Sequence, residues 1–182
     1  MKKVLLLIIS LIFVPVFALA YQTVLINFPD DEGWHAIFYQ KQGHEAILQY
    51  VPAGQNDSHW TKTVIIHSYK RSQDSAAKFM DKSTTQMESK NPSQLYKYLK
   101  YTPMDSIARR CVNKNSLIPS QCEIYRVSKS FEGLITMHYI NKNKQDYTDT
   151  YNDWLDIVRN IDIYNSYFRE DRILDKASSF EL

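Results

Sequence analysis

Glycine, proline, cysteine and excess charge are all scarce in this sequence, and each shortage excludes a class of protein. The chain of 182 residues has 4 Gly and 6 Pro, so it is neither collagen-like nor a low-complexity chain. Its 2 Cys are too few for a small disulfide scaffold. Lys and Arg number 22 against 20 Asp and Glu, and this small surplus gives no reason to expect a nucleic-acid partner.

The one long apolar run lies at the N-terminus. Lys2 and Lys3 precede Val4–Phe17, and a small-x-small tripeptide follows that ends at Ala20. A charged start, an apolar stretch and this tripeptide are typical of a secretory signal peptide, so we expect cleavage after Ala20. The alternative, an uncleaved membrane anchor, would need about 20 apolar residues, and Tyr21 stands where a lipoprotein would carry cysteine. We therefore predict a periplasmic or extracellular protein with no stable membrane anchor.

The leader, residues 1–20, carries the whole charge surplus. It holds two of the 22 cations and no anion, so the rest of the chain has 20 charges of each sign. No internal repeat or linker interrupts that remainder, and its length suits a single domain. We expect one α+β domain over residues 21–164 and a polar C-terminal tail over residues 165–182.

Cys111 and Cys122 are predicted to form a disulfide bond, because exported chains fold in oxidising compartments. They flank Val112–Gln121, whose Asn, Pro and Ser residues are typical of a loop, between two predicted strands. The bridge would close the base of a hairpin loop and stabilise the domain by roughly 3 kcal/mol in the chain-entropy model. The alternative, a redox-active pair, lacks the C-x-x-C spacing of such sites.

Hydrophobic periodicity divides the chain into strands and helices. Alternating or β-branched stretches predict strands at Thr23–Phe28, Trp34–Gln40, Glu45–Val51, Thr61–Tyr69, Ile107–Val112, Glu123–Lys129 and Leu134–Asn141. Apolar residues three and four apart predict helices over Ser72–Lys90 and Thr148–Tyr164, whereas Leu95–Tyr101 fits either a strand or a helix. Strands joined by short turns pair antiparallel. We therefore expect an α+β fold, an antiparallel β-sheet of about six to seven strands with two amphipathic helices packed on one face.

This order of elements over residues 23–164 resembles the Mog1/PsbP-like fold. The string Pro52-Ala53-Gly54-Gln55, which leads to Trp60-Thr61 and a strand, is similar to a pattern in small exported bacterial proteins. The resemblance implies helices set against a twisted antiparallel sheet and export from a bacterial cell. It assigns no functional residue.

The loop from Ala53 to Trp60 is the best candidate for a binding site. It is long for a connection between two strands, and loops held by a rigid sheet often carry recognition. Trp60 could stack on a sugar or a peptide, or it could instead turn inward as the first core residue of its strand. The candidate binding residues are Gln55, Asn56, Asp57, His59 and Trp60.

No catalytic or metal-binding motif occurs in the sequence. H-E-x-x-H and G-x-S-x-G are missing, and the 4 glycines are too scattered to cradle a phosphate. The acidic run Asp30–Glu32 is interpreted as a solvated turn, since a calcium loop needs oxygen ligands at set alternating positions. His35, His67 and His138 lie in predicted strands, where they either share one sheet face or contact separate partners. We expect no metal and no cofactor.

Tyrosine is unusually frequent, with 13 copies, and Tyr96, Tyr98 and Tyr101 cluster after the first helix. Such clusters suit a binding face as well as the exposed side of a sheet.

The sequence therefore predicts an exported, non-enzymatic binding module for a protein, a peptide or a glycan. Nucleic acid is not expected as a partner. The alternative is a small exported hydrolase in which His59 or His67 supplies the base.

Overall fold

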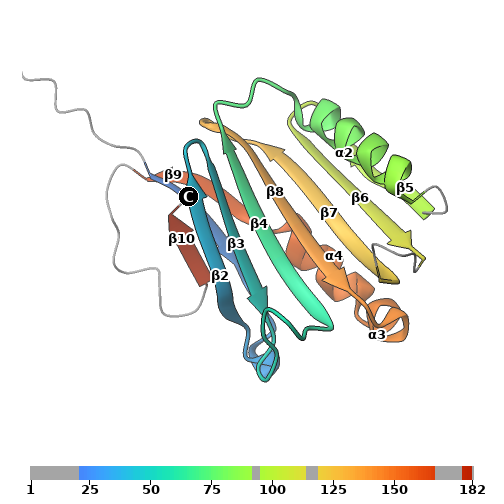
Figure 1. Ribbon diagram of the computed structural model, residues 1–182. Helices are drawn as coiled ribbons and strands as arrows, with labels where there is room; N and C mark the ends of the chain where they lie inside the picture. The colour runs from blue at the N-terminus through green and yellow to red at the C-terminus, as the bar shows by residue number, and fades with distance from the viewer. Residues whose placement is uncertain (1–20, 92–94, 114–118, 167–177, 182) are drawn as a thin grey trace, which may run out of the picture.

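Seven strands form the main sheet of the computed structural model, which describes residues 21–91, 95–113, 119–166 and 178–181 (Figure 1). The strands of this sheet are β2 (His35–Gln42), β3 (Glu45–Val51), β4 (Lys62–Lys70), β5 (Leu95–Tyr101), β6 (Asp105–Val112), β7 (Gln121–Lys129) and β8 (Gly133–Asn141). Their order is β2-β3-β4-β8-β7-β6-β5, and every adjacent pair is antiparallel. The predicted antiparallel α+β fold is confirmed, and the ambiguous segment Leu95–Tyr101 is a strand.

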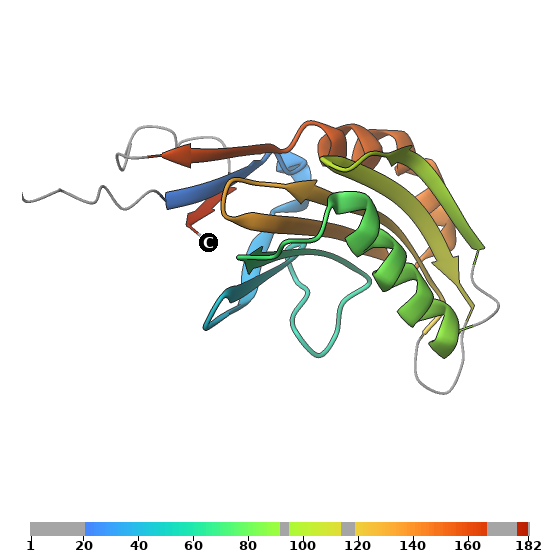
Figure 2. The same cartoon turned by 90° about the horizontal axis from the view of Figure 1, so that it is seen from above.

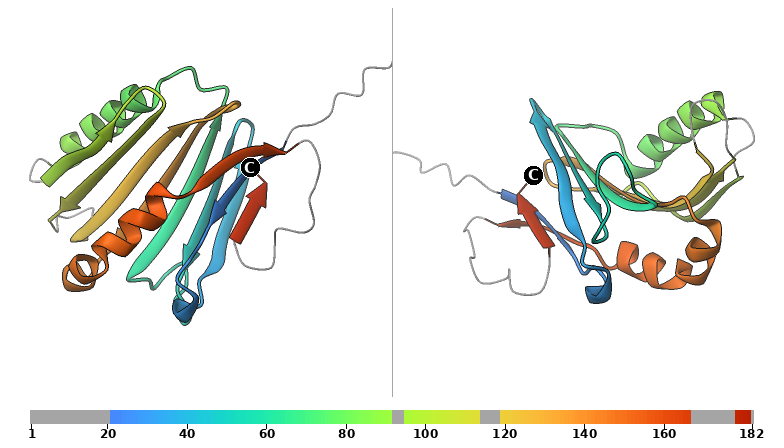
Figure 3. Two further views of the ribbon diagram at one scale, coloured as in Figure 1. Left: turned by 180° about the vertical axis from the view of Figure 1, so that it is seen from behind. Right: turned by 60° about the horizontal axis from the view of Figure 1, so that its bottom comes forward.

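A second sheet of three strands holds both ends of the described chain. Its strands are β1 (Tyr21–Ile26), β9 (Asp162–Ser166) and β10 (Ser178–Glu181), in the order β10-β1-β9. Seen from behind, β1 and β9 cross the main sheet (Figure 3). The first predicted strand therefore lies outside the main sheet. Part of the predicted C-terminal tail belongs to the fold, since β10 pairs with β1, and the remainder of that tail, 167–177 and 182, lies outside the described residues.

Three α-helices and one short 3-10 helix complete the described fold. The 3-10 helix η1 spans Asp30–Glu32, and the α-helices are α2 (Ala76–Lys90), α3 (Lys144–Asp149) and α4 (Tyr151–Arg159). The predicted second helix is thus two helices, with Thr150 between them, and it ends before Tyr164, which lies in β9. No helix among the described residues is long and apolar enough to cross a membrane.

The helix starts follow ordinary capping chemistry. The side chain of Ser75 accepts a hydrogen bond from the backbone N–H of Lys78 at 3.2 Å, and it begins α2. The side chain of Asn143 accepts from the N–H groups of Gln145 and Asp146, and it begins α3. Both side chains satisfy backbone donors that have no partner inside the helix.

The two long amphipathic segments lie on opposite faces of the main sheet (Figure 2). On one side, which we call the α4 face, Trp154 and Val158 of α4 pack in one core cluster with Ile124 of β7. On the other side, the α2 face, Met80 of α2 packs in a second cluster with Tyr125 of β7. The prediction of two helices on one face is therefore not confirmed. β7 and β8 are apolar on both faces, and such strands need a cover on each side.

Aromatic rings fill the α4 face. Trp154 stacks on Tyr139 with ring centroids 3.9 Å apart, and Trp34 meets the Trp154 ring edge-on at 5.1 Å. Val24 and Ile26 of β1 join the same cluster. Helix α4 and the second sheet therefore cover this face between them.

The disulfide bond between Cys111 and Cys122 is confirmed. The two residues stand opposite each other in the β6–β7 pair, with Cα atoms 4.0 Å apart. The bridge clips the base of the loop between these strands, as predicted.

Candidate functional site

Part of the α2 face has no helix over it. Helix α2 packs on β6, β7 and the start of β8, and its Phe79 meets Tyr69 at the end of β4. None of the described helices covers β3 or the rest of β4 and β8 on this side (Figure 2). We call this surface the open face, and it is formed by half-buried side chains that are neighbours in the strand register: Ile47, Gln49, Ile65, His67 and His138.

His67 is held at one border of the open face. Its ring stacks on that of Tyr69 with centroids 3.9 Å apart. Its Nε2 lies 3.2 Å from Oε2 of Glu45 on β3. Burial lowers the pKa of His67 although Glu45 opposes this shift, so the neutral imidazole is favoured.

His138 lies at the opposite border, beside a buried ion pair of the neighbouring strands. Its ring stacks on Tyr125 with centroids 4.1 Å apart, and its Nδ1 is 3.5 Å from Oε2 of Glu123. Glu123 is paired with Arg110, and both side chains are only 5% exposed. Burial and the positive charge of Arg110 lower the pKa of His138 to about 3. The imidazole is therefore neutral at neutral pH.

The two histidines of the open face differ from a catalytic base in their partners and in their pKa values. Among the described residues, the hydrogen bonds of the His67 and His138 rings go to carboxylates, and no hydroxyl or thiol is bonded to them as a nucleophile. A general base works best with a pKa near the operating pH, and both pKa values are lowered. No group of three metal-ligating side chains forms within the described part of the chain. The two neutral imidazoles, the Gln49 amide and the two isoleucines offer mixed polar and apolar contacts.

The loop predicted as the binding site lies on the same side of the sheet as α2, next to the open face (Figure 2). Much of its polarity is used within the loop. Gln55 accepts a hydrogen bond from the N–H of Thr61 at 2.7 Å, and Asn56 accepts from the N–H groups of Ser58 and His59. These side chains fix the loop's shape.

The predicted binding residues of this loop also include Asp57, His59 and Trp60. Asp57 accepts from the N–H of the next residue, and His59 is exposed. Trp60 is half-buried, with Nζ of Lys142 located 3.3 Å from its ring centroid and donating to its carbonyl oxygen at 3.0 Å. One Trp60 ring face is therefore occupied by a cation, and the role of these residues in binding stays a prediction.

Of the three strand histidines, two share the α2 face of the sheet. His67 and His138 lie on β4 and β8, where Thr136 is the register partner of His67 and Ile65 that of His138. His35 is exposed at the start of edge strand β2, beside a register shift. It takes no part in the open face.

The tyrosines after α2 bind the helix to the sheet. Tyr98 and Tyr101 of β5 donate their hydroxyls to Asp81 of α2 at 2.6 and 2.5 Å. The rings of Tyr96, Tyr98 and Tyr101 meet edge to face in succession. This cluster therefore has a structural role, in addition to any contact that its exposed ring edges make.

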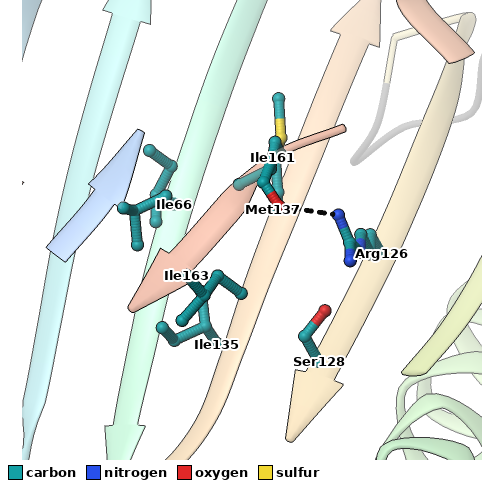
Figure 4. A pocket seen from close by; sticks show the side chains of 8 residues that line it. Ile66, Arg126, Ser128, Ile135, Met137, Ile161 and Ile163 are labelled. Carbon is teal, nitrogen blue, oxygen red and sulfur yellow. Dashed lines mark hydrogen bonds between the residues drawn. The ribbon is translucent and has the colours of Figure 1, made fainter. Parts of the chain in front are cut away.

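A small cavity lies between the second sheet and the main sheet (Figure 4). Its volume is about 10 Å³, and its walls are mainly apolar, with Ile66, Ile135 and Ile163 among them. Such a space holds about one water molecule at most. The cavity is therefore no candidate for a ligand site.

Arg110 and Glu123 belong to no motif in the sequence. A signal was present, because the predicted disulfide fixes the register of its two strands. With Cys111 opposite Cys122, the flanking residues Arg110 and Glu123 must also stand opposite each other. Opposite charges in that position predict an ion pair.

Comparison with protein-family models, with curated proteins and with solved structures found no match to this chain.

Proposed function

We propose that this chain is an exported binding module of the periplasm or the extracellular space, and that it binds a protein, peptide or glycan partner through the open face. The observation that carries the proposal is the unequal cover of the main sheet. The α4 face is closed by α4 and the second sheet, whereas half-buried isoleucine, glutamine and histidine side chains stay accessible on the α2 face. A surface of mixed apolar and polar groups on a rigid sheet suits recognition.

Two features support export. The charged and apolar leader that ends at Ala20 is typical of a secretory signal peptide. The Cys111–Cys122 disulfide is typical of proteins that fold in an oxidising compartment. The intact mass of the protein from its native cells tests this part, and we expect a chain without residues 1–20 and with both thiols oxidised. A retained leader or two free thiols would contradict it.

Capture of a partner from the native cell envelope by chemical crosslinking tests the binding site. Ile65→Lys adds a charge at the centre of the open face, and the long lysine side chain can extend to solvent, so we expect a folded protein that captures its partner at least about tenfold less. Gln86→Lys, an exposed change on the outer side of α2, is the matched control and should capture as the unchanged protein does. Equal capture of the partner by both variants would rule out the open face as the binding surface.

The variant Trp60→Ala distinguishes binding by the predicted loop from binding by the open face. If the loop contributes to binding, this variant loses capture while its thermal unfolding changes little, because Trp60 is only half-buried. Retained capture would assign binding to the open face alone.

A further inference from the structure

We infer that β2 is a dimerisation edge, through which two copies of this chain pair β2 to β2 in antiparallel orientation. The inference concerns the backbone edge of the main sheet and does not depend on the partner of the open face. β2 is the last strand on its side of the sheet, and no strand among the described residues pairs with its outer edge. Alternate residues of such a strand direct their N–H and C=O groups outward, where another strand can bind them.

The other edge of the sheet, β5, is protected in the ways that natural edges usually are. It carries Lys97 and Lys100, and its register shifts at a bulge between Tyr98 and Lys100. Helix α2 is fixed beside it by the hydrogen bonds of Tyr98 and Tyr101 to Asp81. Charge, irregularity and a neighbouring helix all oppose edge-to-edge pairing.

β2 has little of this protection. Seven of its eight residues are exposed, and after a register shift between Ala36 and Phe38 the segment Phe38–Gln42 pairs regularly with β3. That segment contains one charged residue, Lys41, and no proline. Its aromatic side chains are accessible, with Phe38 42% and Tyr39 54% exposed. A regular, exposed, aromatic edge is a template for a further strand.

The two aromatic side chains point to opposite faces of the sheet. Phe38 stands opposite Gln49, which belongs to the open face, and Tyr39 stands opposite Leu48, which packs in the α4-face cluster. An added strand would therefore be contacted by an aromatic ring on each side, as well as by the backbone.

A second copy of the chain fits this edge by symmetry and by charge. If the two-fold axis passes between the two copies of Tyr39, each Tyr39 stands opposite the Tyr39 of the other copy. Phe38 then stands opposite Gln40, and Ile37 stands opposite Lys41. No two like charges meet in this register. Without its leader each chain has 20 charges of each sign, so the copies do not repel through net charge. Because a two-fold axis perpendicular to the sheet keeps equivalent faces on one side, the dimer would place two open faces side by side.

Sedimentation equilibrium of the leader-free protein tests the inference. We expect a reversible monomer–dimer equilibrium in the micromolar range, as suits a small interface. Tyr39→Lys and Tyr39→Glu each place two like charges opposite each other, and each should weaken dimerisation at least about tenfold. An equimolar mixture of the two variants should regain the dimer, because the opposed side chains then attract.

Leu95→Lys is the control, since Leu95 is an exposed apolar residue, 75%, on the protected edge. It should dimerise as the unchanged protein does. Circular dichroism of each variant confirms that it is folded, and the self-association of the unchanged protein tests the inference even where a variant is not. A protein that stays monomeric up to millimolar concentration, or Tyr39 variants that dimerise without loss and show no preference for each other, would overturn the inference.

Discussion

At the scale of single residues, the most consequential group is the buried set Arg110, Glu123 and His138. A buried ion pair loses hydration that only a well-placed partner can compensate, and here Glu123 lies between a guanidinium and an imidazole. His138 belongs to the open face, and Arg110 and Glu123 lie beside that face on β6 and β7. The set fixes the His138 ring against Tyr125 and keeps it neutral, so it determines what the open face offers to a partner.

Glu123→Gln should destabilise the protein strongly. It removes the charge that compensates Arg110 while nearly preserving the shape of the side chain, and loss of one partner of a buried pair typically costs about 3–5 kcal/mol. Urea unfolding measures the free energy. Glu88→Gln, an exposed change on α2, is the control and should cost less than about 0.5 kcal/mol. Similar costs for the two variants would show that the pair is solvated.

Acid should destabilise the protein through His138. Its folded pKa, about 3, lies below the ordinary histidine value of about 6.5, so between these two pH values the unfolded chain binds a proton that the folded chain does not. Stability therefore falls as the pH decreases from about 6.5 towards about 3. The lowered pKa of His67 acts in the same direction.

Urea unfolding of His138→Gln at a series of pH values isolates this contribution. Between pH 6.5 and pH 4, the free energy of unfolding should fall less for this variant than for the unchanged protein. His44→Gln, a change in an exposed turn, should show the full decline. An unchanged slope in His138→Gln would mean that this imidazole titrates freely in the folded protein.

At the scale of helices and strands, local patterns predicted most elements but not all of their ends. The strands around Ile47, Ile65 and Ile124 follow from alternation and β-branching, which act within a few residues. The end of the last helix was missed because Ile161 continues the helical spacing, although it is buried beyond α4 in front of β9. Pairing with β1, more than a hundred residues away, decides that segment.

Arg126 shows how distant residues fix such an end. From β7 its Nη1 donates to the carbonyl oxygens of Val158 and Arg159 at 2.8 and 3.1 Å, and its Nε donates to Asp105 at 2.8 Å. A cation that binds the last carbonyls of a helix stabilises its C-terminus. Nothing in the local sequence of α4 predicts this contact.

Gly133→Ala should be far more damaging than Gly43→Ala. At the first position of β8, Gly133 has a φ of 155°, and an added Cβ would lie 2.1 Å from the carbonyl oxygen of Tyr69, so the end of β4 would have to move. We expect a loss of about 2–4 kcal/mol. Gly43, in the β2–β3 turn, has a φ of 59° with no atom within 4 Å of the added Cβ, and only the backbone cost of about 1 kcal/mol applies. Thermal unfolding of both variants measures the difference, and equal losses would contradict the close approach.

At the scale of the whole molecule, the fold class and the disulfide were predictable, whereas the placement of the helices was not. The sequence does not specify strand order, and the expectation of one covered face failed because β7 and β8 are apolar on both sides. The candidate site depends on the same information. His67 and His138 are 71 positions apart in a sequence of 182 residues, and they share a face only because β4 pairs with β8. The predicted loop next to Trp60 could be found locally, since its polar residues are contiguous.

The measurement that tests the central claim most directly is site-specific photocrosslinking in the native cells. A photoreactive side chain at position 65, in the centre of the open face, should give one discrete crosslinked product with a partner. The same side chain at position 86, on the outer side of α2, should give none. A product at position 86 and none at position 65 would contradict the assignment of the open face as the binding surface.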